Sequence, residues 1–398
     1  MSETHDRVLA RARALAREQP ELDLLVFGSE TASIEAGTGQ HRLGLAEDLT
    51  ACVRGPAGGQ AAGPLLAPEG LVALAAAARA APPAPGPAWA NATARSVPRP
   101  ALSLERGRTL ATSLCSALEA LRLPVTAVLV HQTAAWSVRL SGQTETWRAD
   151  PKQLVFARYE TPLGPVVDGH GQPSLDAEVA LAPFEARARE VLALAAAAAH
   201  PVPALPWVLG PSVAAPFVAA LASLLGPEGA LSRMVGKQLF PRVLSLIDDP
   251  LHPLACARAG ADVLGTEASA HGIIEQGVLK AAIGTAPGRM QHRGGGGVGR
   301  GPVNLLVQPG QGELPADRLE LTTRLETFIT HVRPGKVTAI AAGWEVRGGE
   351  RVRRVGPIDL DFQVLELLRR VTATGNDLRF FPSSDEVGVP SLALSPLP

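Results

Sequence analysis

The best-spaced pair of metal-ligand side chains is His252 and Cys256, four positions apart, where Pro253 could begin a helix. On a helix the imidazole and the thiol would share one face and could hold a metal ion together. No third ligand stands near them, and the other histidines among the nine are scattered. Because a zinc site needs at least three protein ligands, we expect a capping histidine and a buried thiol here instead.

A glycine-rich segment could bind an anion or an extended peptide, because basic side chains flank the glycines at 294–297. A phosphate loop places its glycines between a strand and a helix N-terminus, followed by Lys and Ser or Thr. Here Pro302 and a strand-like Asn-Leu-Leu-Val run follow. This order favours a flexible loop whose bare backbone can lie against a peptide strand. The candidate peptide-binding residues are Arg289, His292, Arg293, Gly299, Arg300 and Asn304.

Asp248 and Asp249 form a carboxylate pair just before Pro250. Adjacent side chains point in different directions, so joint acid–base catalysis is disfavoured and a turn is expected. The sequence has no Gly-x-Ser-x-Gly motif, so no serine is singled out as a nucleophile. Its three cysteines lie far apart without a CxxC pair, which argues against a disulfide framework or a thiolate cluster.

The composition is that of a globular protein, with 46% hydrophobic and 19% charged residues. A chain of 398 residues exceeds the size at which single cores stop growing, so two domains are expected. The formal net charge of -1 leaves no basic field for non-specific nucleic-acid binding. The N-terminus lacks a signal-peptide core, and the longest apolar run, 191–199, is too short to span a bilayer. We therefore expect a cytoplasmic protein.

In the first half of the chain, helices are expected to alternate with strands. Helical periodicity covers residues 4–17, 71–80, 104–121 and 184–199. Strands are expected at 22–27, then as short segments up to Val53, at 125–130, in a hairpin turning at Ser141-Gly142, and at 154–159. The proline-rich stretch 81–100 is expected to be an extended surface connection.

The spacing of Pro201, Pro203 and Pro206 marks the best domain boundary in the sequence. We therefore divide the chain into an N-terminal domain, 1–203, and a C-terminal domain, 204–398. The second half is expected to be mostly β, with a strand at 207–209 and a helix at 216–225. Residues 314–329 are predicted to be helical, 337–346 and 351–355 to be paired strands, and 362–370 to be a strand or a short helix.

Several stretches of the second half, taken in order, resemble the TldD/PmbA family, once described as modulators of DNA gyrase. They are VLGPSVAAPFVAAL (208–221), IDDP (247–250), IIEQGVLK (273–280), PVNLLVQPG (302–310), the stretch 356–380, and GVPSL (388–392). The first hundred residues look abbreviated beside that family. The resemblance implies an α+β fold, with an N-terminal α/β domain, a C-terminal domain of mainly antiparallel strands, and dimers that enclose a cavity.

In the proteolytic branch of that family, the helix after the VLGP-like strand carries an HExxxH motif, and a cysteine near the C-terminus completes a zinc site. The resemblance places Ala219, Ala220 and Leu224 at the positions of the two histidines and the glutamate. None of these side chains can bind zinc. The stretch 381–389 contains no cysteine. The chain therefore resembles the TldE/PmbA side of the family, which lacks the motif.

The resemblance implies a non-catalytic subunit that pairs with a zinc-bearing TldD-like partner in a heterodimeric peptidase acting on unfolded or leader-type peptides. No cofactor is expected in this chain, and zinc is expected in the partner. An alternative is a homodimeric peptide-binding or regulatory protein without peptidase activity. A third hypothesis is an enzyme with a relocated site that uses His252, Cys256, His271 or His292.

Overall fold

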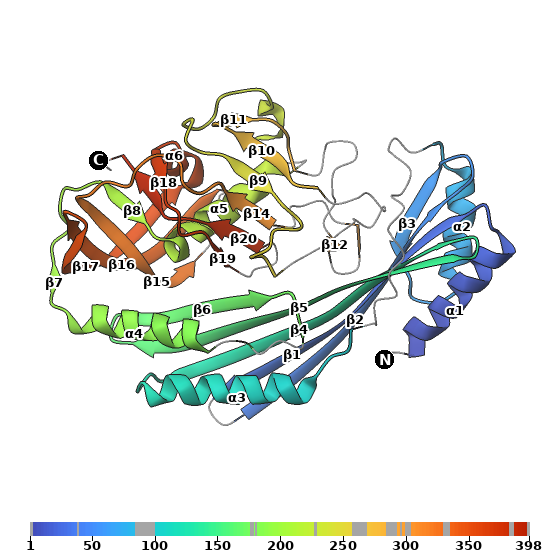
Figure 1. The fold of residues 1–398 in the computed structure, drawn as a ribbon, viewed down its shortest axis with the longest axis horizontal. Helices are drawn as coiled ribbons and strands as arrows, with labels where there is room; N and C mark the ends of the chain where they lie inside the picture. The colour runs from blue at the N-terminus through green and yellow to red at the C-terminus, as the bar shows by residue number, and fades with distance from the viewer. Residues whose placement is uncertain are drawn as a thin grey trace.

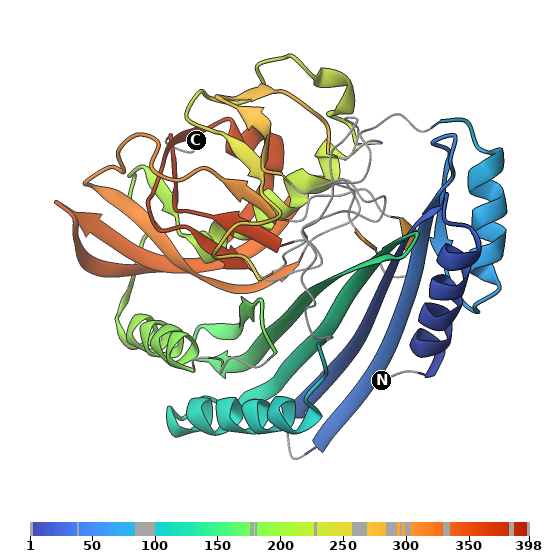
Figure 2. The ribbon, with the colours of Figure 1, turned by 45° about the vertical axis from the view of Figure 1, so that its right-hand side comes forward.

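A computed structural model describes residues 3–37, 40–83, 100–175, 179, 181–226, 229–256, 269–283, 293–294, 297–298, 304–328, 335–381 and 386–395. The chain forms a long curved sheet in its N-terminal half and a more compact set of strands in its C-terminal half (Figure 1). The two halves lie against each other along β6 and α4 (Figures 1 and 2). No helix in the described residues is long and apolar enough to cross a membrane.

The N-terminal sheet is antiparallel throughout, in the order β3-β2-β1-β4-β5-β6. Its strands are β1 (Asp23–Gly37), β2 (Gln40–Arg54), β3 (Gln60–Pro64), β4 (Val125–Ser141), β5 (Thr144–Thr161) and β6 (Gly164–Gln172). β1 and β4 run side by side through the centre from Asp23–Ser141 to Ala36–Val128. The predicted short strands are thus parts of strands long enough to carry two separate cores.

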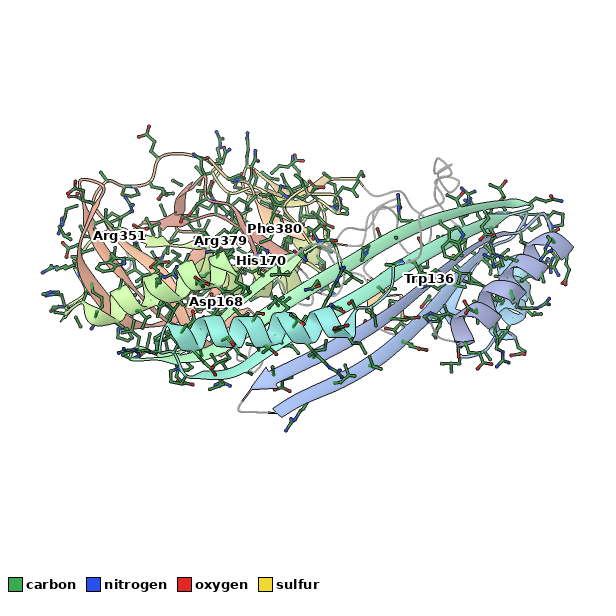
Figure 3. The ribbon with its side chains drawn as sticks, turned by 60° about the horizontal axis from the view of Figure 1, so that its bottom comes forward. Trp136, Asp168, His170, Arg351, Arg379 and Phe380 are labelled. Atoms are coloured by element: carbon green, nitrogen blue, oxygen red, sulfur yellow. The ribbon has the colours of Figure 1, made fainter. Side chains whose placement is uncertain are left out.

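Helices cover one face of this sheet at both ends. α1 (Glu3–Glu18) and α2 (Gly70–Ala80) pack over one end, and α3 (Leu104–Ala120) packs over the other (Figure 1). Trp136 of β4 fills the core beneath α1 (Figure 3) and lies across Gly28 of β1, where any Cβ would collide with the indole ring. Arg13 of α1 binds Glu145 of β5 through two hydrogen bonds of 3.0 and 2.7 Å, which fixes the helix on the sheet.

Two sheets build the C-terminal half. The seven-stranded sheet has the order β18-β21-β8-β15-β16-β17-β7, and the six-stranded sheet has the order β11-β10-β9-β14-β20-β19. The first contains β7 (Ala199–His200), β8 (Trp207–Leu209), β15 (Arg318–Phe328), β16 (Lys336–Arg347), β17 (Glu350–Gln363), β18 (Val371–Thr374) and β21 (Leu392–Leu394). The second contains β9 (Leu246–Asp248), β10 (His271–Glu275), β11 (Val278–Leu279), β14 (Asn304–Val307), β19 (Arg379–Phe381) and β20 (Glu386–Val389).

Helix α5 (Pro211–Leu225) joins the two C-terminal sheets through one core. Its apolar side chains share one core with those of β9, β14 and β20 from one sheet and of β15 and β16 from the other. α6 (Val364–Leu368) closes this core, and a short hairpin of β12 (Arg293–Gly294) and β13 (Gly297–Val298) stands apart near β3. The expected α+β fold class is therefore confirmed.

The prediction of a helix at 314–329 was wrong, because this segment contains strand β15. Alternate side chains of β15, those of Leu319, Leu321, Thr323 and Leu325, are buried, as a strand with one face on a core requires. β15 lies between β8 and β16, and this pairing overrides the helix propensity of its Leu, Glu and Arg residues. The segment 362–370, left open between strand and short helix, contains α6.

The predicted helices at 4–17, 71–80 and 104–121 are confirmed by α1, α2 and α3. The predicted helix at 184–199 is α4 (Ala182–Ala196), which ends three residues early, and Ala199 and His200 form β7 on the edge of β17. Most of the predicted loop at 81–100 lies outside the described residues. The division between residues 203 and 204 remains a prediction.

The two halves of the chain are joined by the buried side chain of Arg187 on α4, which is 7% exposed. Its guanidinium donates to the Thr322 carbonyl of β15 at 2.7 Å and to Ser212 Oγ at the start of α5 at 3.2 Å. It also faces the carboxylate of Asp168 on β6, with Nε and Oδ1 3.8 Å apart. One cation therefore bridges elements of both halves.

A tyrosine completes this junction from the N-terminal sheet. Tyr159 of β5 donates its hydroxyl proton to Asp168 Oδ2 at 2.7 Å. Burial raises the pKa of Tyr159 far above its usual value, and the neighbouring negative charge of Asp168 raises it further. The hydroxyl therefore stays protonated and remains a donor to Asp168 over the physiological pH range.

Replacing Arg187 by Met should lower the free energy of unfolding by about 3–5 kcal/mol, because it removes the buried cation that bonds Glu190 and faces the largely buried Asp168 carboxylate. Urea denaturation of the whole chain measures the change. The matched control is Arg189→Met on the same helix, where the side chain is 61% exposed and pairs with Glu185. Its expected effect is within about 0.5 kcal/mol. Equal losses for the two variants would contradict the assignment.

Candidate functional site

Several of the second-half stretches that carry the family resemblance meet in the six-stranded sheet. The 247–250 stretch contributes β9, the 273–280 stretch contributes β10 and β11, and the 302–310 stretch contributes β14. β9 lies between β10 and β14, and β14 pairs in parallel with β20, which leads into the 388–392 stretch. Segments far apart in the sequence are thus brought to one place.

Asp248 holds the centre of this sheet together. Its carboxylate is buried and accepts the backbone N–H of Asn304 on Oδ1 at 3.1 Å, while Oδ2 lies 3.9 Å from His271 Nε2. Asn304 is fully buried and donates its side-chain amide to the Asp249 carbonyl at 2.9 Å. His271 Nδ1 lies 3.2 Å from the Ser269 carbonyl, which orients the ring. Asp248 therefore links β9 to both of its neighbouring strands, β14 and β10.

A cleft of about 860 Å³ opens beside this sheet. Ile247, Ile274 and Val278 supply its apolar surface, while Arg242, Lys280 and Glu275 supply charge. Gln238, Ser245, Ala270, His271, Gly272, Gln276 and Gln308 complete the lining. Apolar side chains beside amide and cationic donors suit a polypeptide segment, which has side chains to bury and carbonyl or carboxylate oxygens to bind.

The positions at which the resemblance implied zinc ligands lie on α5. Ala219 and Ala220 are partly buried against the shared core, and Leu224 is buried within it. A Cβ at Gly335 would stand 2.9 Å from a Leu224 methyl carbon, so that glycine, at φ +83°, leaves room for the leucine. None of the three side chains offers a lone pair to a metal. These residues do not fit a zinc ion.

Of the six predicted peptide-binding residues, only Asn304 and Arg293 lie in the part of the chain that the structure describes. Asn304 is buried and donates its side-chain amide to the Asp249 carbonyl, and its role in peptide binding stays a prediction. Arg293 lies in the β12–β13 hairpin, and Arg289, His292, Gly299 and Arg300 lie outside the described residues.

The residues of the relocated-site hypothesis are not brought together. The His252 ring packs against that of Phe380, with centroids 4.8 Å apart, whereas Cys256 is buried against β6 at Gly171. His271 lies at the cleft with Asp248, and His292 is outside the described residues. In the described part of the chain, no three His, Cys, Asp or Glu side chains form a metal-binding group.

Residues 204–397 match the family model of the PmbA/TldA metallopeptidase C-terminal domain. This C-terminal domain belongs to the TldD/PmbA family. No curated protein matches the sequence. The TldD/PmbA stretches recognised in the sequence therefore mark the strands that build the centre of the domain.

Solved structures share the fold over nearly the whole chain. A Thermotoga maritima protein described as a candidate modulator of a DNA gyrase aligns with a TM-score of 0.69 and 18% identity, over 98% of this chain and 99% of that one. TldE from Thermococcus kodakarensis has the same TM-score and coverage at 15% identity. A Bacteroides thetaiotaomicron protein, also described as a candidate modulator of DNA gyrase, has a TM-score of 0.62 at 15% identity, over 99% and 98% of the two chains.

Sequence reasoning missed the cleft. Gln238 and Arg242 come from a segment without periodicity, and Gln308 follows β14 by one residue, so nothing local marks them as neighbours. The available signal was the 273–280 stretch, whose Gln276-Gly277 turn, with φ of +47° and +78°, forms the β10–β11 hairpin beside the cleft. Only the tertiary structure brings Gln238, Arg242 and Gln308 to the cleft.

Replacing Asn304 by Leu should lower the free energy of unfolding by about 1–3 kcal/mol, because the fully buried Asn304 amide no longer donates to the Asp249 carbonyl. Thermal or urea denaturation measures the loss. Gln308→Ala is the matched control, since Gln308 is exposed beyond the end of β14, and its effect should stay within about 0.5 kcal/mol. A stable Asn304→Leu variant would contradict this structural role of Asn304.

Proposed function

We propose that this chain is a non-catalytic, TldE-type subunit of a cytoplasmic zinc metallopeptidase whose zinc is carried by a TldD-like partner. The observation that supports the proposal is the chemistry of α5, where Ala219, Ala220 and Leu224 stand at the positions that the family resemblance assigns to an HExxxH motif. Membership in the TldD/PmbA family and the fold shared with a TldE support it. The substrates are unfolded or leader-type peptides.

In this proposal the chain contributes a peptide-binding surface and leaves the hydrolysis to its partner. The cleft beside β10 offers Arg242 and Lys280 to carboxylates, and glutamine side chains to backbone groups, around an apolar surface. Zinc in the partner would polarise the scissile carbonyl and activate water. What this chain's residues would do is hold the substrate.

A second candidate function, peptide binding without cleavage in a homodimer, is favoured by the same cleft. Its lining can bind a peptide without any contribution from a catalytic partner. The two functions differ in whether a zinc-bearing subunit is needed.

The purified chain should contain no stoichiometric zinc and should not cleave an unfolded protein, because the α5 positions offer no ligand. Mixed with an HExxxH-bearing relative from the same genome, it should form a complex that contains zinc and cleaves. Metal analysis of each subunit and a peptidase assay measure this. The matched control complex carries Gln in place of the partner's motif glutamate, and it should bind but not cleave. Zinc and cleavage by the chain alone would refute the proposal.

Charge reversal in the cleft tests the peptide surface separately. Arg242→Glu should raise the KM of the complex for an acidic peptide about fivefold, with kcat and zinc content unchanged, because a surface ion pair is worth up to ~1 kcal/mol. Arg233→Glu is the control, since Arg233 is also exposed but lies outside the cleft lining. An unchanged KM for Arg242→Glu would remove the cleft from the binding surface.

A further inference from the structure

Five polar side chains form two adjacent rows across the middle of the N-terminal sheet. Thr31, Thr133 and Lys152 stand directly opposite one another on β1, β4 and β5. Ser33 and His131 stand opposite each other in the next row on the same face. Because neighbouring strands lie about 4.8 Å apart, and residues i and i+2 of one strand about 7 Å apart, the five occupy a patch of about 10 by 7 Å. We call these five residues the central polar cluster.

The central polar cluster lies on the face of the sheet opposite to the helices. Ile34 and Val130 alternate with its members along β1 and β4, and they pack in the core beneath α3. Thr133 is buried, at 8% exposure, and the other four side chains are partly buried. Charges and hydrogen bonds therefore act more strongly here than on an open surface, because water screens them less.

Much of the hydrogen-bonding capacity of the cluster is unused. Within the described ranges, no hydrogen bond or ion pair engages the side chains of Thr31, Thr133 and Lys152. Ser33 Oγ and His131 Nδ1 lie 2.9 Å apart and share one hydrogen bond. A neutral imidazole and a hydroxyl carry one polar hydrogen each, so one of the two is left to donate outward in either tautomer.

Lys152 supplies the positive charge of the cluster. Burial lowers the pKa of His131 below its usual value, and the positive charge of Lys152 lowers it further. The ammonium group is therefore close enough to the imidazole ring to act on its ionisation. An anion bound beside Lys152 would offset this repulsion and would accept a hydrogen bond from the protonated ring, so both groups favour the same kind of ligand.

Two carboxylates limit the size of that ligand. Asp150 precedes Lys152 by two residues on β5, and Glu35 follows Ser33 by two residues on β1, so both belong to the flanking rows of this face. A polyanion such as a nucleic acid would bring its next phosphate against one of these carboxylates, which disfavours it. A single oxyanion group avoids that repulsion.

The donors of the cluster suit a tetrahedral oxyanion. They are two threonine hydroxyls, the free hydrogen of the Ser33–His131 pair and the Lys152 ammonium, and they come from three neighbouring strands. A phosphate group presents at least three oxygens in different directions, whereas a carboxylate presents two oxygens in one plane. The phosphate group therefore uses more of these donors at once.

We propose that the central polar cluster binds one tetrahedral oxyanion of the phosphate class, held by Lys152 and by the hydroxyl and imidazole donors of β1 and β4. The site goes beyond the proposed function, because it uses neither the cleft nor a zinc-bearing partner. Free phosphate and a phosphomonoester are the two sources of such a group.

Isothermal titration calorimetry of the whole chain with inorganic phosphate at pH 7 tests the site. The wild-type chain should bind with a Kd of about 1 mM or tighter. Lys152→Gln should weaken binding about tenfold or more, because a charge-assisted hydrogen bond is lost. Arg158→Gln is the matched control and should bind as the wild type does, since Arg158 lies on the same strand and face about 20 Å away.

Thermal unfolding checks that each variant is folded. A wild-type chain that binds no phosphate overturns the proposal, and so do equal losses of affinity in Lys152→Gln and Arg158→Gln.

The ionisation of His131 gives a second readout, which a purely structural cluster would not change. Phosphate should raise the pKa of His131, because the bound anion stabilises the imidazolium. Lys152→Gln should raise this pKa without phosphate, and added phosphate should then change it less. An NMR pH titration with labelled histidine follows the ring, and His131→Asn assigns its signal. A pKa of His131 that phosphate leaves unchanged in the wild-type chain overturns the proposal.

Two further ligands define the chemistry of the site. Acetate at matched ionic strength should bind at least tenfold more weakly than phosphate, and equal affinities would overturn the assignment to a tetrahedral oxyanion. O-phosphoserine distinguishes the two sources, since tighter binding than free phosphate identifies a phosphomonoester and weaker binding identifies free phosphate. None of these measurements involves zinc or cleavage, so failure of this proposal can be told apart from failure of the proposed function.

Discussion

The buried guanidinium of Arg187 constrains how the two halves of this protein can be arranged. Its charge is taken out of water on α4, so its hydrogen-bonding groups need partners within the protein. Its guanidinium donates to Glu190 on the same helix, to the Ser212 hydroxyl at the start of α5 and to the Thr322 carbonyl of β15, and the last two come within reach only when both halves are in place. The junction therefore specifies an arrangement more than it adds stability, since a buried ion pair recovers little beyond its desolvation cost.

The position of α5 follows from this junction. Ser212 lies at the start of the helix and bonds both Arg187 and the Thr322 carbonyl, at 3.2 and 2.9 Å. The N-terminal end of α5 is therefore fixed to the N-terminal half of the chain. The apolar side chains of the helix fill the core between the two C-terminal sheets. Ala219 and Ala220 lie on that core as partly buried small residues, and Leu224 is enclosed. At these positions α5 contributes packing between the sheets and offers no metal ligand.

The apolar periodicity of the sequence predicted correctly those helices whose apolar face is visible within the segment itself. The leucines of α3 and the apolar face of α1 repeat every three to four residues, and both helices were predicted within about two residues of their ends. β15 shows the limit. Its Leu319 and Leu321 alternate as a strand requires, but the intervening Glu, Thr and Arg residues are equally compatible with a helix. The pairing with β8, more than a hundred residues earlier, decides the conformation.

The candidate site depends even more than β15 does on contacts between residues far apart in the sequence. Asp248 looked like the first residue of a turn, yet it is a buried carboxylate that accepts the Asn304 N–H from a strand 56 residues away. The turn forms one residue later, where Asp249 Oδ1 accepts the N–H of Leu251 at 3.1 Å. Asp248 therefore links two strands, whereas Asp249 stabilises a turn. Only the turn could be derived from the local sequence. The family resemblance located the segment correctly because it preserves the order of such distant strands, which residue chemistry alone does not reveal.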